Sequence, residues 1–191
     1  MILKEIRTRT APYHTQLEQS SLLLPFSHGA IDSATYALIL QKFYGYFSPL
    51  EQKLTLFTDL SQWLGDYTEC RKARLLLNDL KYLYPDAPSP ALCPDLPAVA
   101  SLAQAFGCLY VMEGSTLGGK LIYKILQNNL QLDHQHGASF FYGYGEETGP
   151  KWKAFGQALQ AFCESTGEDE NVIHAANETF SKLAQWLQTS T

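Results

Sequence analysis

The chain has 191 residues, 46% of them hydrophobic, and a formal net charge of −5 at pH 7. This length and composition suit one domain, 1–191, with a sizeable core, and the negative balance argues against nucleic acid as a partner. No apolar stretch approaches the ~20 residues of a membrane span, and charges interrupt the apolar runs of residues 1–14, unlike a signal peptide. The four cysteines are far apart, as is typical of reduced thiols: Cys70, Cys93, Cys108 and Cys163. We therefore expect a cytoplasmic protein with no membrane partner.

Apolar residues recur at helical spacing along the chain, and no strand alternation is convincing, so the sequence predicts an all-α protein. The predicted helices cover residues 2–20, 33–60, 68–84, 98–128, 150–165 and 170–188. Asp32 or Ser33 can cap the second helix, and Pro49 should kink it. The proline-rich stretch 85–97 must be a connector because it cannot be helical.

The first predicted helix carries His14, with Glu18 one turn further on the same face. A neutral imidazole is the commonest metal ligand among side chains, and a carboxylate at its other ring nitrogen can fix the tautomer. One histidine is too few for structural zinc but enough for haem, whose macrocycle supplies the equatorial ligands. The alternative is a structural or surface histidine. Arg7, two turns earlier on roughly the same face, can pair with a carboxylate or remain a solvated charge.

The helix predicted at 98–128 contains Gly114, Gly118 and Gly119. Glycine within a helix costs roughly 1 kcal/mol relative to alanine, so this clustering needs a reason. Without Cβ atoms the helix can bend, and a large, flat ligand can lie almost against the backbone. Gly114 and Gly118 share one face, and Gly119 should widen this bare strip. Close helix packing or a kink without a ligand is the alternative.

Together these two segments resemble the haem oxygenase family, and closely its bacterial, biliverdin-producing branch. The first is HTQLE at 14–18 and the second is YVMEGSTLGG at 110–119. A third stretch, FFYGYG at 140–145 followed by GPKWK at 149–153, is similar to the family's approach to its penultimate helix. The resemblance spans nearly the whole chain. It implies an all-α, single-domain bundle with haem between the first, proximal helix and a glycine-kinked distal helix.

The resemblance also implies roles for single residues. It implies a catalytic part for His14, Gly114, Ser115 and Gly118, with His14 as the iron ligand. The haem-binding residues it implies are Arg7, His14, Glu18, Tyr110, Gly114, Gly118, Gly119, Lys153 and Phe180. Of these, Arg7, Tyr110 and Lys153 would contact the propionates, and Phe180 would be an apolar residue of the distal pocket. The family often has a second basic residue one turn after Lys153. This chain has Gln157 there, so that contact and the identity of the oxidised meso carbon are in doubt.

In the family, haem b is both cofactor and substrate. The resemblance implies that O₂, as co-substrate, and electrons from a ferredoxin or flavoprotein open the ring to biliverdin, CO and ferrous iron. It also implies a downstream protein that accepts the bilin as a further partner.

Two kinds of protein compete with this interpretation. One is a haem-binding carrier or sensor without turnover. The other is a different enzyme on the same helical scaffold, such as a di-iron oxygenase or a thiaminase-like hydrolase. A di-iron bundle needs Glu-x-x-His pairs, and none occurs in the sequence. A thiaminase-like enzyme needs a nucleophilic cysteine in a polar cleft, whereas Cys108 and Cys163 lie in apolar helical segments.

Overall fold

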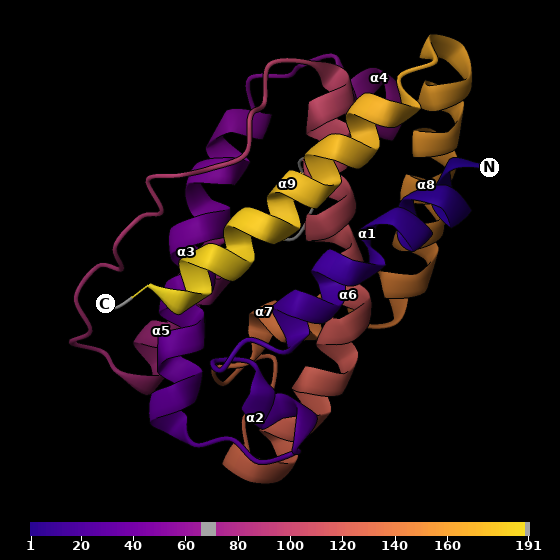
Figure 1. The fold of residues 1–191 in the computed structure, drawn as a ribbon. Coiled ribbons are helices and arrows are strands. Elements are labelled where there is room, and N and C mark those ends of the chain that lie inside the picture. Colours follow the sequence, from indigo (N-terminus) through magenta and orange to yellow (C-terminus); the bar gives the residue numbers. More distant parts are fainter. Residues whose placement is uncertain (66–71, 190–191) are drawn as a thin grey trace.

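The computed structural model describes residues 1–65 and 72–189. The described residues form a bundle of helices (Figure 1): α1 (Ile2–Glu18), α2 (Leu24–Ser27), α3 (Ser33–Leu54), α4 (Leu60–Leu64), α5 (Arg74–Leu83), α6 (Leu102–Leu130), α7 (Ser139–Tyr142), the 3₁₀ helix η2 (Gly145–Glu147), α8 (Thr148–Thr166) and α9 (Asp169–Gln188). These ranges contain no β-strand, only one isolated bridge between Asp133 and Gly137. The predicted all-α class is confirmed.

The predicted helices correspond to long helices of the structure, with different ends. The second is shorter than predicted, because α3 ends at Leu54 and a separate short helix, α4, follows. Asp32 caps α3 by accepting a hydrogen bond from the Thr35 backbone N–H at 2.7 Å, which also lowers the pKa of this carboxyl. Pro49 lies inside α3, and the helix continues past it. The predicted start of the third helix, at 68–71, lies outside the described residues.

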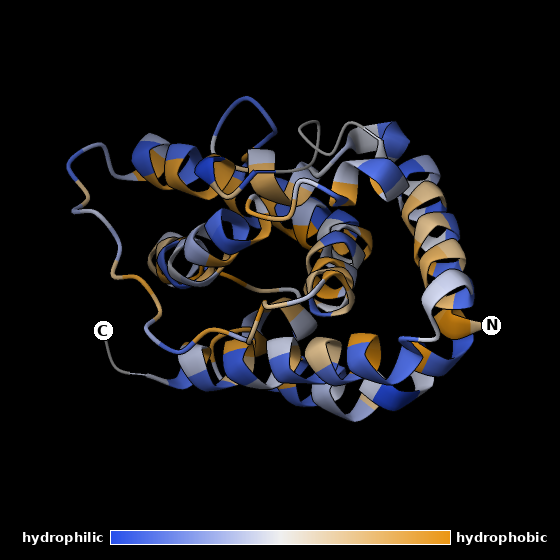
Figure 2. Ribbon diagram, turned by 90° about the horizontal axis from the view of Figure 1, so that it is seen from above, coloured by the Kyte–Doolittle hydropathy of each residue, from blue (hydrophilic) through white to orange (hydrophobic). Residues whose placement is uncertain are grey.

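Helix α9 crosses the bundle and packs against both α1 and α6 (Figure 1). The hydrophobic sides of the helices turn inward around a shared core (Figure 2). The Tyr46 hydroxyl donates a hydrogen bond to the Thr179 carbonyl at 2.8 Å, which ties α3 to α9 within this core. None of the helices in the described ranges is long and apolar enough to cross a membrane.

Gly107 marks the closest approach of α6 to α9. A Cβ built on Gly107 would lie 2.4 Å from the Val172 carbonyl oxygen and 2.6 Å from the Ala175 Cβ. Both atoms belong to α9, and backbone cannot yield without shifting the helix. This glycine therefore has a packing reason, because a side chain would push the two helices apart.

Replacing Gly107 with alanine should destabilise the fold, although alanine is the better helix former. We expect a net loss of about 1–3 kcal/mol, because overpacking outweighs the gain in helix propensity. Urea unfolding of both proteins, followed by circular dichroism, measures the difference. A variant as stable as the wild type would show that the α6–α9 interface can accommodate a Cβ at this position.

Candidate haem-binding site

His14 lies on α1 with its side chain 54% exposed, and its Nδ1 is 3.4 Å from Glu18 Oε2. The Phe180 ring, from α9, meets the imidazole edge-on with a centroid separation of 5.5 Å. Within the described ranges, Nε2 has no hydrogen-bond partner. The carboxylate thus lies close to one ring nitrogen, and the other is available as a ligand. Because α9 packs beside α1, the Phe180 ring lies against His14, and its place in the distal pocket stays a prediction.

The α1 and α6 helices meet where Arg7 and Thr10 lie beside Tyr110. Burial raises the pKa of the Tyr110 hydroxyl, and a hydrogen bond with Thr10 and the positive charge of Arg7 partly offset this rise. Arg7 itself is exposed, and the structure shows no ion pair for it among the described residues. The guanidinium is therefore free to pair with a ligand carboxylate at this junction.

The face of α6 that carries the glycines is buried at one end of the helix and exposed further along it. At Gly107 this face packs against α9, and helical spacing carries it on through Gly114, Gly118 and Leu121. A Cβ on Gly118 would meet nothing within 4 Å, and Leu117 and Leu121 are 44% and 66% exposed. Beyond the α9 crossing, the face is therefore apolar, bare at its centre and uncovered. A flat apolar ligand fits it.

Gly119 does not widen this strip. It is buried, and a Cβ there would lie 2.9 Å from the Phe141 carbonyl oxygen of α7. Consecutive helical residues are rotated by about 100°, so Gly119 turns away from the face that Gly118 occupies. Ser115 is also turned from it: its hydroxyl donates to the Met112 carbonyl of its own helix at 2.7 Å. The structure thus gives Gly119 a packing role against α7.

Trp152, on α8, was not singled out from the sequence. Its indole carbons lie 3.5 Å from the Cβ position of Gly114, and its ring centroid is 5.7 Å from that of Tyr110. The tryptophan therefore borders the glycine strip at the end nearest Arg7. The sequence signal that could have identified Trp152 is its position between Lys151 and Lys153, near the start of α8.

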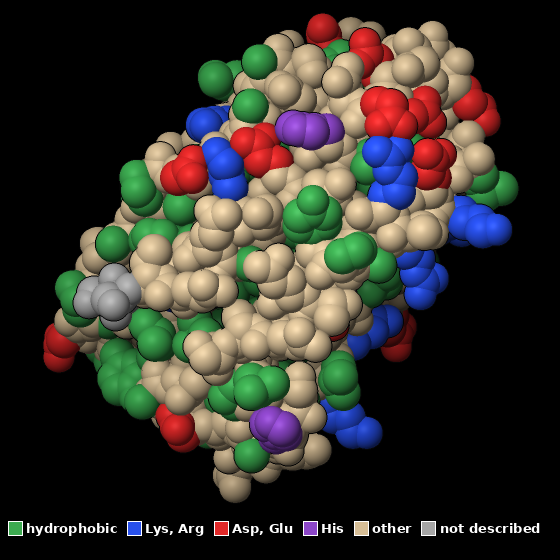
Figure 3. Space-filling view, in the orientation of Figure 1, with side chains coloured by type: hydrophobic (Ala, Val, Ile, Leu, Met, Phe, Trp, Pro, Cys, Tyr) green, Lys and Arg blue, Asp and Glu red, His purple; other side chains and the backbone are tan. Residues whose placement is uncertain are grey.

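Lys153 is exposed on the first turns of α8 and has no ion pair among the residues that the structure describes. Lys and Arg side chains gather along one edge of the molecule, over α1, α6 and α8 (Figure 3). The exposed cations on these helices are Lys4, Arg7, Arg9, Lys120, Lys124 and Lys153. Arg9 is already paired with Glu170 of α9: Nη1 donates a hydrogen bond to Oε1, and Nη2 donates one to Oε2 at 2.8 Å. This edge can receive anionic groups despite the net negative charge of the chain.

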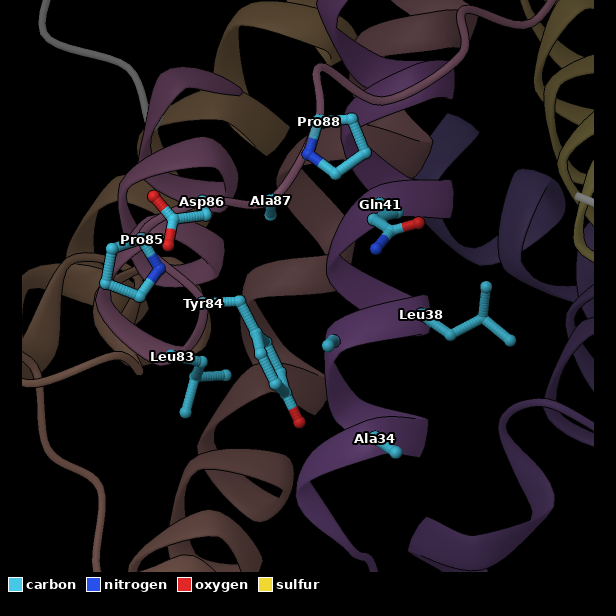
Figure 4. A pocket seen from close by; sticks show the side chains of 10 residues that line it. Ala34, Leu38, Gln41, Leu83, Tyr84, Pro85, Asp86, Ala87 and Pro88 are labelled. Carbon is cyan, nitrogen blue, oxygen red and sulfur yellow. The ribbon is translucent and has the colours of Figure 1, made fainter.

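A cavity among the described residues lies elsewhere, between α3 and the segment 83–88 (Figure 4). It holds about 610 Å³ and is lined by Ala34, Ala37, Leu38, Gln41, Leu83, Tyr84, Pro85, Asp86, Ala87 and Pro88. This groove has no histidine, cysteine or methionine as an iron ligand and no cation for propionates. The one charged residue among those that line it, Asp86, is negative and would repel the propionates. It is a poorer haem site than the α1–α6 region.

Comparison with known proteins agrees with this geometry. The model of the family described as heme oxygenase matches residues 1–189. The chain belongs to the haem oxygenase family. A curated heme oxygenase from Xanthomonas campestris pv. campestris is 28% identical, with 84% of this chain and 93% of the relative aligned. One from Porphyra purpurea is 25% identical over 99% of this chain and 87% of its own.

Among solved structures, the NO- and CO-bound heme oxygenase from Neisseria meningitidis superposes with a TM-score of 0.80 at 24% identity. The match covers 98% of this chain and 90% of that one, so the two share one fold. The arrangement described above, in which α9 packs against α1 and crosses α6 at Gly107, thus belongs to the fold of that structure.

Three features of the described residues fit haem in this family member. His14 offers one unengaged ring nitrogen, which suits a single axial ligand. The uncovered α6 face matches a flat apolar ring, and a Cβ at Gly118 would project into the space that such a ring needs. Arg7 and Lys153 add charges suited to carboxylates.

Proposed function

We propose that this haem oxygenase binds haem b between α1 and α6 and opens it, with O₂ and electrons, to biliverdin, CO and ferrous iron. The observation that carries the proposal is the pairing of an available His14 Nε2 with the glycine strip of α6, which Trp152 borders at Gly114 and which is uncovered at Gly118. The names of the curated relatives support it. We propose a cytoplasmic, single-domain enzyme, an electron donor of the ferredoxin or flavoprotein type, and a protein that accepts the bilin.

On the proximal side, His14 would hold the iron through Nε2. The Glu18 carboxylate lies 3.4 Å from Nδ1 and would favour the tautomer and orientation that ligation needs. Phe180 of α9 packs edge-on against the imidazole and would restrict rotation of the His14 side chain. Bound haem would supply both the iron at which O₂ is reduced and the porphyrin carbon that is oxidised.

On the distal side, Gly114 and Gly118 would let the α6 backbone lie low over the ring and leave room for a small ligand. Leu117 and Leu121 would keep bulk water from the ring face once they are covered. The Ser115 hydroxyl, which donates to the Met112 carbonyl at the start of the strip, would help to order a water that delivers protons. No side chain of the strip needs to act as a strong acid or base.

At the edge, Arg7 and Lys153 would pair with the propionates, with Tyr110 between α1 and α8 as a further donor. We expect Arg7→Ala and Lys153→Ala each to weaken haem binding by about 1–2 kcal/mol, the range for a partly exposed charge-assisted contact. Each should also change the ratio of biliverdin isomers, because a haem with fewer anchors can rotate about its normal.

Haem titration followed by chromatography of the product measures both effects. Lys81→Ala, an exposed lysine of α5, is the matched control. If affinity and isomer ratio are the same in both edge variants as in the control, neither residue holds a propionate.

Haem turnover tests the function itself. Haem is titrated into the wild-type protein, and ascorbate or a ferredoxin system is added in air. We expect the Soret band to bleach and biliverdin to form. A carrier or sensor would bind haem and keep the Soret band under the same conditions, which would refute the enzyme.

Other chemistry on this scaffold finds less support. The described residues contain no group of three or more His, Cys, Asp and Glu side chains placed to hold a metal, as a di-iron site would require. Burial raises the pKa of the Cys108 thiol to about 11 and that of Cys163 to about 12, so neither is an activated nucleophile. Cys93 is also unpaired and buried, and Cys70 lies outside the described residues.

A further inference from the structure

Glu113, the residue immediately before Gly114, carries a carboxylate that is buried next to the glycine strip. The residue is only 9% exposed, although it lies within an apolar helix. Burying a carboxylate is costly unless it is hydrogen-bonded, so its position needs a reason. A rotation of about 100° per residue turns Glu113 away from the face of Gly114 and toward the link between α7 and α8.

That link provides a partner. The Tyr144 hydroxyl donates a hydrogen bond to Glu113 Oε2 at 2.9 Å, joining positions 31 residues apart in the sequence. The link is tight: Gly143 and Gly145 both have positive φ, 64° and 59°. A Cβ on Gly143 would lie 3.7 Å from the Thr116 Cβ, so the link runs along α6 within one turn of Glu113.

The same segment of α6 contains features that allow it to bend. The Ser115 hydroxyl donates to the Met112 carbonyl at 2.7 Å, and the Thr116 hydroxyl to the Glu113 carbonyl at 2.6 Å. Such bonds to the preceding turn compete with the helical ladder and often bend a helix. With Gly114 between them, this stretch of backbone is compliant, and an outside contact can set its position.

The first turn of α8 reaches both sides of the strip. Lys151 Nζ lies 5.0 Å from the centroid of the Tyr144 ring, a cation–π contact that holds the ring in place. The next residue, Trp152, contacts the Cβ position of Gly114 on the other side. Two neighbouring residues of α8 thus act on α6 near Gly114. Lys151 holds Tyr144, which is bound to Glu113, and Trp152 contacts Gly114 directly.

We propose that the Tyr144–Glu113 hydrogen bond is a positioning contact that fixes the height of the Gly114–Gly118 strip above bound haem. Glu113 is a positioning residue that acts through the α6 backbone and does not touch the ligand. This inference rests on the proposed function, and it adds a residue pair that controls the distal side from behind the helix.

The variant Tyr144→Phe tests it, because it removes one hydroxyl and keeps the ring under Lys151. In the protein without haem, amide hydrogen exchange of residues 110–118 should be about tenfold faster, the effect of losing a buried hydrogen bond to a charged group. In the ferrous CO complex, the C–O stretching band should shift or split. Haem affinity should stay within about threefold of wild type, while the yield of biliverdin per haem falls.

Two variants make the result specific. Glu113→Gln keeps an oxygen that can accept from Tyr144 and should retain the wild-type exchange and CO band more closely than Tyr144→Phe. Tyr36→Phe also removes a buried tyrosine hydroxyl bond, 2.9 Å to the Gly137 carbonyl, but it lies on α3. This control should lower global stability without a selective effect at 110–118.

If Tyr144→Phe matches Tyr36→Phe in exchange pattern and CO band, the contact is ordinary packing and the inference is wrong. If wild type turns haem over while Tyr144→Phe is unchanged in every measurement, only the positioning role fails. A wild-type protein that binds no haem would refute the proposed function and this role together.

Discussion

Replacing His14 with alanine should lower biliverdin formation by more than about 100-fold, because even partners of metal ligands contribute 10- to 100-fold. The imidazole is the one group at the site with an unengaged ring nitrogen and a carboxylate on the other. Ferric and ferrous haem spectra of the variant should lose the signature of a histidine ligand. Added imidazole should restore it in part, because a free ligand can enter the space left by the side chain.

His174→Ala is the matched control, since His174 is an exposed histidine of α9. It should leave spectra and turnover unchanged. If His14→Ala binds haem with wild-type ferric and ferrous spectra, another residue ligates the iron and the proximal assignment is lost.

Replacing Gly118 with alanine should separate stability from activity. A Cβ there meets nothing in the protein, so the melting temperature should rise or stay level, with a gain of up to roughly 1 kcal/mol from helix propensity. Oxygenation should nevertheless fall about tenfold or more, because the added methyl overpacks the distal side of the bound ring. Gly114→Ala, whose Cβ would be at normal contact distance from Trp152, should follow the same pattern.

Gly107→Ala and Gly119→Ala give the comparison, because their Cβ atoms would meet backbone at 2.4 and 2.9 Å. Both should lose stability and keep normal turnover per folded molecule. Measuring melting temperature and biliverdin yield on all four variants decides the matter. Normal yield in Gly118→Ala would show that the strip does not face haem.

The sequence predicts the fold class and the two sides of the site well, because helical periodicity and short motifs are local signals. His14 with Glu18, and Gly114 with Gly118, follow from spacing on single helices. The role of each glycine depends on which element packs against it, and the sequence does not reveal this. Gly119 packs against α7, whereas a Cβ on Gly118 would meet no protein atom within 4 Å. The contact of Phe180 with His14 was not predicted for the same reason, since only the path of α9 places its ring there. Trp152 and Glu113 acquire their roles through contacts 38 and 31 residues away in the chain.

The crystal structure of the haem complex of this chain would test the central claim most directly. We predict that the iron is bound by His14 Nε2, that the ring lies against Gly114 and Gly118, and that Leu117 and Leu121 become covered. Haem found in the groove between α3 and the segment 83–88, or bound through a residue other than His14, would contradict the account.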